Sequence, residues 1–194
     1  MSEYINKRFG KLLVLGGFGA ITFLSFISLL LNIFDAYGDI AILFGILRVI
    51  ASIVITGGFA IVYLAEKEKI DLLITIGFGV STFSSIIGLF IDSSNIGGTI
   101  AVSLLSIVGF AGYFVWSYKL KGFNELAGRL IIWALIGSFV ASFVLSFFAS
   151  ALYMQDLPRS AMRTITSVVS CLTSFVALIE CAAYSFAAFA DLQN

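Results

Sequence analysis

Histidine is absent from this 194-residue sequence, which contains one proline and two cysteines. The lack of histidine excludes imidazole general bases, histidine-ligated haem and the common histidine-based metal sites. Cys171 and Cys181 are ten residues apart on one expected helix, about 15 Å along its axis, so they cannot form a disulfide with each other. No P-loop, dinucleotide fingerprint or H-E-x-x-H motif is present either. We therefore expect no enzymatic activity, no metal and no cofactor.

Charged residues are also scarce, since they make up 11% of the sequence while 60% is hydrophobic and the mean hydropathy is +1.10. A water-soluble fold of this composition would lack polar surface, so a lipid bilayer must surround the fold. A helix needs about 20 residues to cross a hydrocarbon core of about 30 Å. The sequence predicts an all-α integral membrane protein, a single domain over residues 1–194, with six transmembrane helices at 12–34, 40–65, 72–91, 96–118, 130–154 and 164–187.

The basic residues of the connectors predict the orientation of the helices. One side carries Lys7, Arg8, Lys11, Lys67, Lys69, Lys119, Lys121 and Arg129. The other side carries Arg159 and Arg163, beside the acidic residues Asp35, Asp39, Asp92 and Asp156. Because lysine and arginine resist translocation, we expect both termini to be cytoplasmic, in a prokaryotic inner membrane. Near the cytoplasmic ends, we interpret three aromatic residues as interface anchors: Trp116, Tyr118 and Trp133.

A shift of 60 residues relates the odd-numbered spans to one another. Gly17-Phe18-Gly19 recurs as Gly77-Phe78-Gly79. A second shift of 60 residues superposes Gly77 on Gly137. The even-numbered spans share a weaker pattern, Arg-x-Ile-x-Ser, at residues 48–52 and 163–167. We interpret these matches as three tandem helical hairpins, arranged as parallel repeats about an axis normal to the membrane. Such a ring either encloses a central pathway or packs shut.

Small residues recur at helical spacing in the third and fifth spans. The stripes consist of Gly77, Ser81 and Ser85, and of Ser138, Ser142, Ser146 and Ser150. Small side chains let helix backbones approach closely in lipid, where packing and interhelical hydrogen bonds hold a bundle together. We expect these stripes to mark helix-packing faces. The functional alternative is a polar seam along a water or solute path.

Two ionisable residues fall inside expected spans, where a charge costs about 2.5–3.5 kcal/mol on insertion scales. Arg48 lies about 12 Å from the outer end of its span, so its side chain can snorkel toward the headgroups. Glu180 has no basic residue within two turns of its own helix, so its carboxyl needs a partner, a proton or a bound cation. These two residues are the candidates for a transport pathway. The span boundaries place Arg48 and Glu180 in opposite leaflets, which disfavours an ion pair between them.

Glycine pairs are the candidates for breaks in these helices, because the single proline, Pro158, falls in a loop. Many secondary transporters interrupt a helix at proline or glycine near the middle of the membrane. Gly57 and Gly58 lie deep in the second span and are the predicted hinge.

The expected function is a small transporter or channel for an unidentified solute or ion. The alternative is a non-catalytic transmembrane subunit or scaffold of a larger membrane complex, and a pore-forming effector would differ from a channel only in its regulation. The expected partners are the lipid bilayer and either further copies of the chain or other membrane subunits, and no nucleic acid. A scaffold would turn its serine and glycine stripes outward onto other chains, whereas a transporter would place Glu180 beside a cavity.

Overall fold

The computed structural model describes residues 2–34, 40–91, 96–153 and 158–193. These residues form six helices: α1 (Ser2–Ile33), α2 (Ala41–Glu66), α3 (Lys69–Phe90), α4 (Ile96–Lys121), α5 (Glu125–Tyr153) and α6 (Arg159–Leu192). Each of the six contains a segment long and apolar enough to cross a membrane. The prediction of an all-α chain with six span-length apolar helices is therefore confirmed.

Several helices extend beyond the predicted spans. α1 begins at Ser2 instead of residue 12, and α6 continues to Leu192 instead of residue 187. With its 34 residues, α6 is about 51 Å long, which exceeds a hydrocarbon core of about 30 Å. Hydropathy detects the part of a helix that lies in lipid, whereas backbone hydrogen bonding continues the helix into the headgroup region and beyond. The sequence therefore predicted the apolar segments better than the helix ends.

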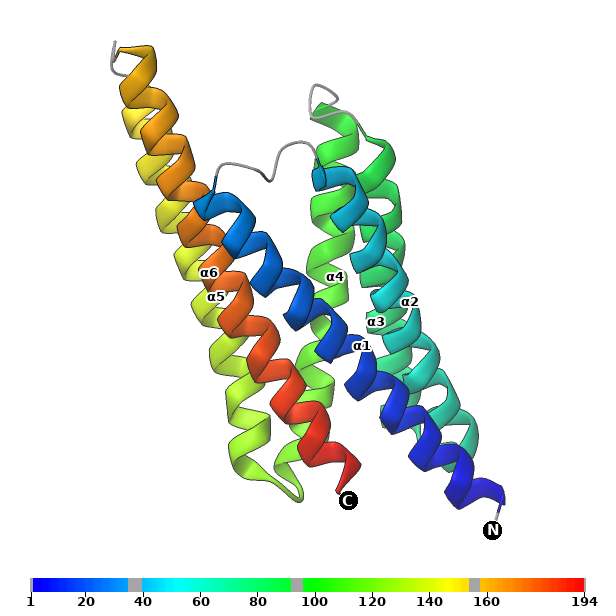
Figure 1. The fold of residues 1–194 in the computed structure, drawn as a ribbon. Coiled ribbons are helices and arrows are strands. Elements are labelled where there is room, and N and C mark those ends of the chain that lie inside the picture. Colours follow the sequence, from blue (N-terminus) through cyan, green and yellow to red (C-terminus); the bar gives the residue numbers. More distant parts are fainter. Residues whose placement is uncertain (1, 35–39, 92–95, 154–157, 194) are drawn as a thin grey trace.

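The helices pack in sequence order around a ring. Each helix contacts the next one along the chain, and α6 contacts α1. Both ends of the chain lie at the same end of the bundle, which we call the terminal end; the opposite end is the distal end (Figure 1). Toward the distal end, α5 and α6 diverge from α4 (Figure 1). The ring is thus tight at the terminal end and splayed at the distal end.

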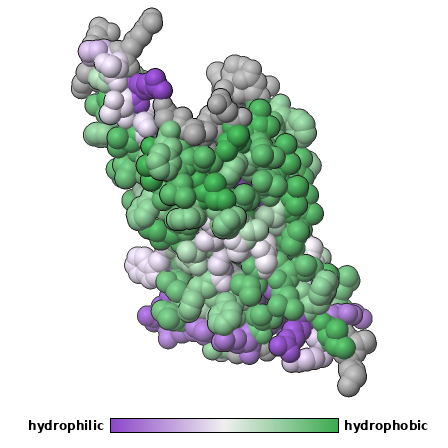
Figure 2. All heavy atoms as spheres, in the orientation of Figure 1, coloured by the Kyte–Doolittle hydropathy of each residue, from purple (hydrophilic) through white to green (hydrophobic). Residues whose placement is uncertain are grey.

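The outer surface of the bundle is apolar over most of its height. Figure 2 shows a broad band of hydrophobic side chains, with hydrophilic side chains gathered at the terminal end and at the distal tip of the α5–α6 pair. Large apolar side chains are among the most exposed of the described chain, such as Phe90, Ile42 and Phe147. In water this surface would be unfavourable, whereas in a bilayer it matches the surrounding acyl chains.

Two glycine contacts set the closest approaches between neighbouring helices. Between α1 and α2, a Cβ added at Gly58 would lie 2.7 Å from the backbone oxygen of Gly10. Between α3 and α4, a Cβ added at Gly112 would lie 2.9 Å from the Cα atom of Gly77. Backbone atoms cannot move aside as the end of a flexible side chain can. Both crossings therefore require glycine, in the manner of close helix pairs in membranes.

The small-residue stripes of α3 and α5 differ in their surroundings. Gly77 lies at the α3–α4 crossing, and an added Cβ at Gly109 of α4 would meet Ser81. The remaining members are exposed, apart from the half-buried Ser138: Ser85, Ser138, Ser142, Ser146 and Ser150. Because the distal half of α5 diverges from α4, the α5 stripe does not pack into the ring there. A packing role for its exposed serines stays a prediction about contacts with other chains.

We predict that Gly77→Ala and Gly112→Ala each lower the stability of the bundle by about 1–3 kcal/mol, the usual cost of overpacking. The measurement is the melting temperature of the detergent-solubilised protein. Gly19→Ala is the matched control, because no atom lies within 4 Å of its added Cβ, and alanine is the better helix former. An unchanged melting temperature in both α3–α4 variants would show that these helices do not approach this closely.

Candidate functional site

An aromatic cluster fills the centre of the ring in its terminal half. The cluster consists of Phe18, Phe59, Phe78, Tyr113, Trp116 and Tyr184, which come from α1, α2, α3, α4 and α6. Phe18 lies at its middle: its ring stacks on that of Trp116 with centroids 5.4 Å apart, and the Tyr184 ring lies 5.6 Å away. Phe18 and Trp116 are almost completely buried. These side chains close the centre of the ring at this level.

Trp116 does not have the anchoring role that the sequence suggested. Its side chain is fully buried in the aromatic cluster, and its Nε1–H donates a hydrogen bond to Asp191 Oδ2 at 3.1 Å. Proximity to a helix end and an indole ring were the basis of the prediction, but both also fit a core tryptophan with a polar partner. Tyr118 and Trp133 are largely exposed, as interface anchors are.

A buried ion pair joins α1 to α6 below the cluster. The ammonium of Lys11 lies 2.8 Å from Asp191 Oδ1 and donates to the Asp191 backbone oxygen, also at 2.8 Å. Both side chains are nearly buried, with 6% and 10% of their surface exposed. Since Asp191 also accepts the Trp116 hydrogen bond, this carboxylate connects α1, α4 and α6. A charge pair this well enclosed holds three helices in one arrangement at the terminal end.

A second ion-pair network joins α1, α2, α3 and α4 at the same end. Lys119 of α4 lies 2.8 Å from Glu66 and 2.6 Å from Asp71, and Lys7 of α1 also pairs with Glu66. Glu66, Glu68 and Asp71 offer carboxylate oxygens within 4.8 Å of one another, a spacing that could hold a metal ion. The Lys119 ammonium lies within 3.8 Å of all three. These carboxylates therefore already share a cation that belongs to the chain.

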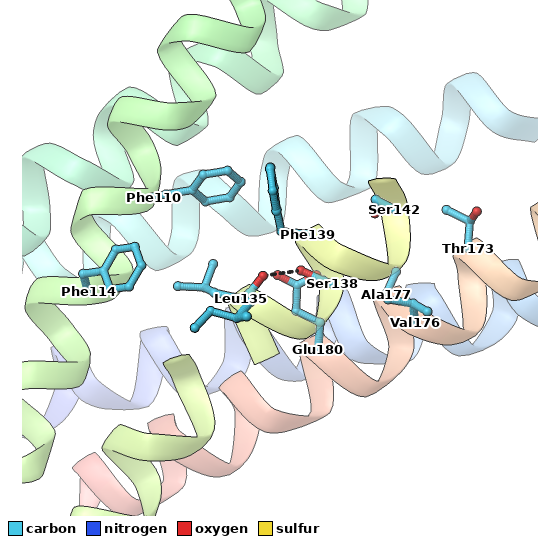
Figure 3. Close-up of a pocket in the computed structure, with 11 residues that line it drawn as sticks. Phe110, Phe114, Leu135, Ser138, Phe139, Ser142, Thr173, Val176, Ala177 and Glu180 are labelled. Atoms are coloured by element: carbon cyan, nitrogen blue, oxygen red, sulfur yellow. Dashed lines mark hydrogen bonds between the residues drawn. The ribbon is translucent and has the colours of Figure 1, made fainter. Parts of the chain in front are cut away.

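A pocket of about 550 Å³ lies on the distal side of the aromatic cluster, between α4, α5 and α6. Phe110 and Phe114 of α4 and Phe139 of α5 extend into the space between these helices, and Glu180 of α6 lies at its edge (Figure 3). The other polar side chains of the lining are hydroxyls: Ser138, Ser142 and Thr173. The volume falls in the range of pockets for small organic molecules.

Glu180 has a neutral hydrogen-bond partner at the base of this pocket. The Tyr184 hydroxyl, one turn along α6, donates to Glu180 Oε1 at 2.6 Å, and Ser138 of α5, whose hydroxyl donates to the Leu135 backbone oxygen at 3.1 Å, lines the pocket beside it. Tyr184 belongs to the aromatic cluster, so Glu180 lies directly above the point where the ring closes. Within the part of the chain that the structure describes, no lysine or arginine forms an ion pair with Glu180. Its carboxyl group is thus the main polar feature of an apolar cavity.

Arg48 lies much closer to Glu180 than the sequence suggested. Its Nη2 donates to Ser28 Oγ at 3.1 Å, and its side chain lines a second pocket of about 310 Å³ between α1, α2 and α6. Thr173 and Ala177 of α6 line both this pocket and the Glu180 pocket. Ala177 and Glu180 are separated by about 4.5 Å along the helix axis, so Arg48 and Glu180 lie closer together in depth than the span boundaries predicted. Distances counted from span ends ignored the unequal extension of the helices and the reach of the arginine side chain.

Polar pairs run along the contact between α1 and α6. Thr22 Oγ1 lies 2.9 Å from Ser185 Oγ, and Asn32 Nδ2 donates to Ser174 Oγ at 2.8 Å. Between them, Ser25 Oγ contacts Cys181 Sγ at 3.7 Å. This antiparallel register fixes which residues of α6 face the ring interior. Thr173, Ala177, Glu180 and Tyr184 follow one another at spacings of three and four residues and form that inner face.

The predicted hinge lies within an unbroken helix. α2 is continuous from Ala41 to Glu66, and Gly58 packs against α1, which accounts for that glycine. No atom lies within 4 Å of a Cβ built at Gly57, so packing does not account for Gly57. A hinge at this pair stays a prediction.

The ion pairs of the terminal end were missed by sequence reasoning. Lys11 and Lys119 entered only the prediction of orientation, and no prediction named Glu66, Asp71 or Asp191. The available signal was that Lys11 and Asp191 each lie at the margin of an apolar helix, one turn or less from the lipid-facing segment. Without the antiparallel register of α1 and α6, nothing in the sequence pairs them.

Comparison with protein-family models, with curated proteins and with solved structures gives no match to this chain. The functional argument therefore depends on the geometry described above.

We predict that Lys119→Met lowers the stability of the protein by about 3 kcal/mol, because it leaves Glu66 and the buried Asp71 without their shared cation. Arg129→Met is the matched control, since Arg129 pairs with Glu125 on the exposed surface, where an ion pair contributes about 0.5 kcal/mol. Thermal unfolding in detergent compares the two variants. Equal melting temperatures would contradict a structural role for the Lys119 network.

Proposed function

We propose that this chain is a small integral membrane transporter that binds a small solute or ion in the pocket beside Glu180. The observation that carries the proposal is the position of this acid. It lies at the base of a pocket of about 550 Å³ and accepts a hydrogen bond from Tyr184, a member of the aromatic closure. Intramembrane carboxylates that face a cavity are typical of substrate and proton pathways.

The closure at one end supports a carrier over a permanently open pore. On the terminal side of the pocket, the aromatic cluster and the two ion-pair networks fill the ring. On the distal side, the helices are splayed (Figure 1). A molecule in the pocket would thus exchange with the distal side, and release on the terminal side would require the cluster and the ion pairs to separate. Closure on one side of a binding pocket is what an alternating-access carrier requires in one of its states, and this supports the proposal.

We further propose that the terminal end faces the cytoplasm of a prokaryotic cell. Eight of the eleven lysines and arginines belong to this end, whereas Arg159 and Arg163 belong to the start of α6 at the distal end. The positive-inside rule then places the Glu180 pocket on the external side of the closure.

The proposed ancestry as three hairpins explains where the pocket lies. Phe18 and Phe78 occupy equivalent positions of the 60-residue repeat, and both belong to the aromatic cluster. The third equivalent position is Ser138, which neighbours Glu180 and lines the pocket. A phenylalanine at each position would give three rings at the centre. The serine leaves room beside α5, and its hydroxyl lines the pocket.

A non-catalytic subunit of a larger membrane complex is the second candidate. Three exposed serines of α5, Ser142, Ser146 and Ser150, favour it, because a partner helix could pack against these small side chains. In this case Glu180 would bind a polar group of the partner and no solute would cross.

Solute-coupled flux tests the proposal most directly. Purified protein is reconstituted into proteoliposomes that contain a pH-sensitive dye, and internal pH is followed after addition of organic cations, organic anions and neutral solutes. We expect at least one solute class to drive a pH change, and Glu180→Gln to reduce its rate by about tenfold or more, because the variant cannot exchange a proton.

Glu125→Gln is the matched control, since Glu125 is an exposed acid at the start of α5, and its flux should equal that of wild type. An unchanged rate in Glu180→Gln would remove Glu180 from the mechanism. Wild-type vesicles that respond to no solute class would favour the subunit over the transporter.

A further inference from the structure

We infer that the Glu180 pocket selects hydrophobic organic monocations that enter from the membrane between α4 and α5. This inference rests on the proposed function and names the class of substrate. Three features of the pocket carry it: a carboxyl group with no basic partner, aromatic rings around it, and an opening toward lipid.

The charge of the ligand follows from the hydrogen-bond partners of Glu180. Tyr184 donates to Oε1, and Ser138 is the other polar neighbour; both are neutral. Arg48, whose pocket meets the Glu180 pocket at Thr173 and Ala177, donates to Ser28, and among the described residues it forms no ion pair with Glu180. An ionised carboxylate in an apolar site is costly unless a cation accompanies it. A bound monocation would supply that charge.

The aromatic side chains favour an organic cation over a hydrated metal ion. Phe110, Phe114 and Phe139 surround the space above Glu180 (Figure 3). Benzene rings attract a cation through their faces, and they pack well against apolar substituents. A small metal ion needs several oxygen ligands, whereas the lining offers one carboxyl group and three hydroxyls, and all other lining side chains are apolar.

The route of entry follows from the exposed surface beside the pocket. Phe110, Phe114, Ile136 and Phe139 line the pocket and are each more than a third exposed. They lie on α4 and α5, which diverge toward the distal end (Figure 1). A hydrophobic solute dissolved in the distal leaflet can therefore reach Glu180 without crossing a polar rim.

Two probes of the same shape and opposite charge test the inference. Tetraphenylphosphonium is a hydrophobic cation, and tetraphenylborate is its anionic counterpart. Equilibrium binding of each labelled probe to the detergent-solubilised full chain is measured against protein-free micelles. We expect the cation to bind wild-type protein at least about tenfold more tightly than the anion, and Glu180→Gln to lose at least about tenfold in cation affinity, because a charge-assisted contact is removed.

Aromatic variants provide an independent measurement if Glu180→Gln alters the fold. Phe114→Leu should weaken cation binding by about two- to fivefold through the loss of one ring face, without a matching change for the anion. Glu125→Gln is again the control and should bind both probes as wild type does. Melting temperatures of all variants show which of them are folded.

The inference is overturned if wild-type protein binds the two probes equally, if it prefers the anion, or if folded Glu180→Gln binds the cation as tightly as wild type does. In those cases, Glu180-dependent flux of another solute class would leave the transporter proposal standing with a different substrate. Conversely, Glu180-dependent cation binding without any flux would retain the ligand class and exclude transport. The two proposals can thus fail separately.

Discussion

The packing of Phe18 against side chains of α3, α4 and α6 is the interaction on which the rest of the structure depends. Each helix of the ring packs against its two neighbours. In lipid, no hydrophobic force draws the helices toward a common centre. Large interlocking rings at one depth provide dispersion contacts there. The buried Lys11–Asp191 pair, which also holds Trp116 by a hydrogen bond, secures the same level. The aromatic cluster and this ion pair therefore hold the helices together near the terminal end of the bundle.

The helices diverge in the distal half because the aromatic cluster and the buried ion pair join them only near the terminal end. Beyond the cluster, α5 stays packed on α6 and α6 on α1, whereas α5 and α6 diverge from α4 (Figure 1). Glu180 and Arg48 lie in this half, on pockets that meet at Thr173 and Ala177 of α6. The two intramembrane charges thus occupy the part of the ring that helix packing does not fill. Among the described residues neither of them forms an ion pair; Glu180 accepts a hydrogen bond from Tyr184, and Arg48 donates one to Ser28.

The sequence predicted the number and positions of the apolar helices because hydropathy and length alone determine whether a segment suits a bilayer. It also singled out Glu180 and Arg48, since any charge in such a segment is conspicuous. It could not predict which residues meet across the ring. The antiparallel register of α1 and α6 brings Asp191 next to Lys11 and Trp116. This register depends on contacts between residues 180 positions apart, which the sequence pattern does not reveal. The depth of Arg48 was misjudged for the same reason.

Access to the pocket from one side of the membrane is the central claim, and cysteine labelling tests it. In a background with Cys171 and Cys181 replaced by alanine, Ser142→Cys places a thiol on the lining of the Glu180 pocket. A membrane-impermeant, positively charged methanethiosulfonate reagent is applied to membrane vesicles of either orientation. The account predicts rapid modification when the distal side faces the reagent and protection when the terminal side does. Equal rates from both sides, or modification from the terminal side alone, would contradict it.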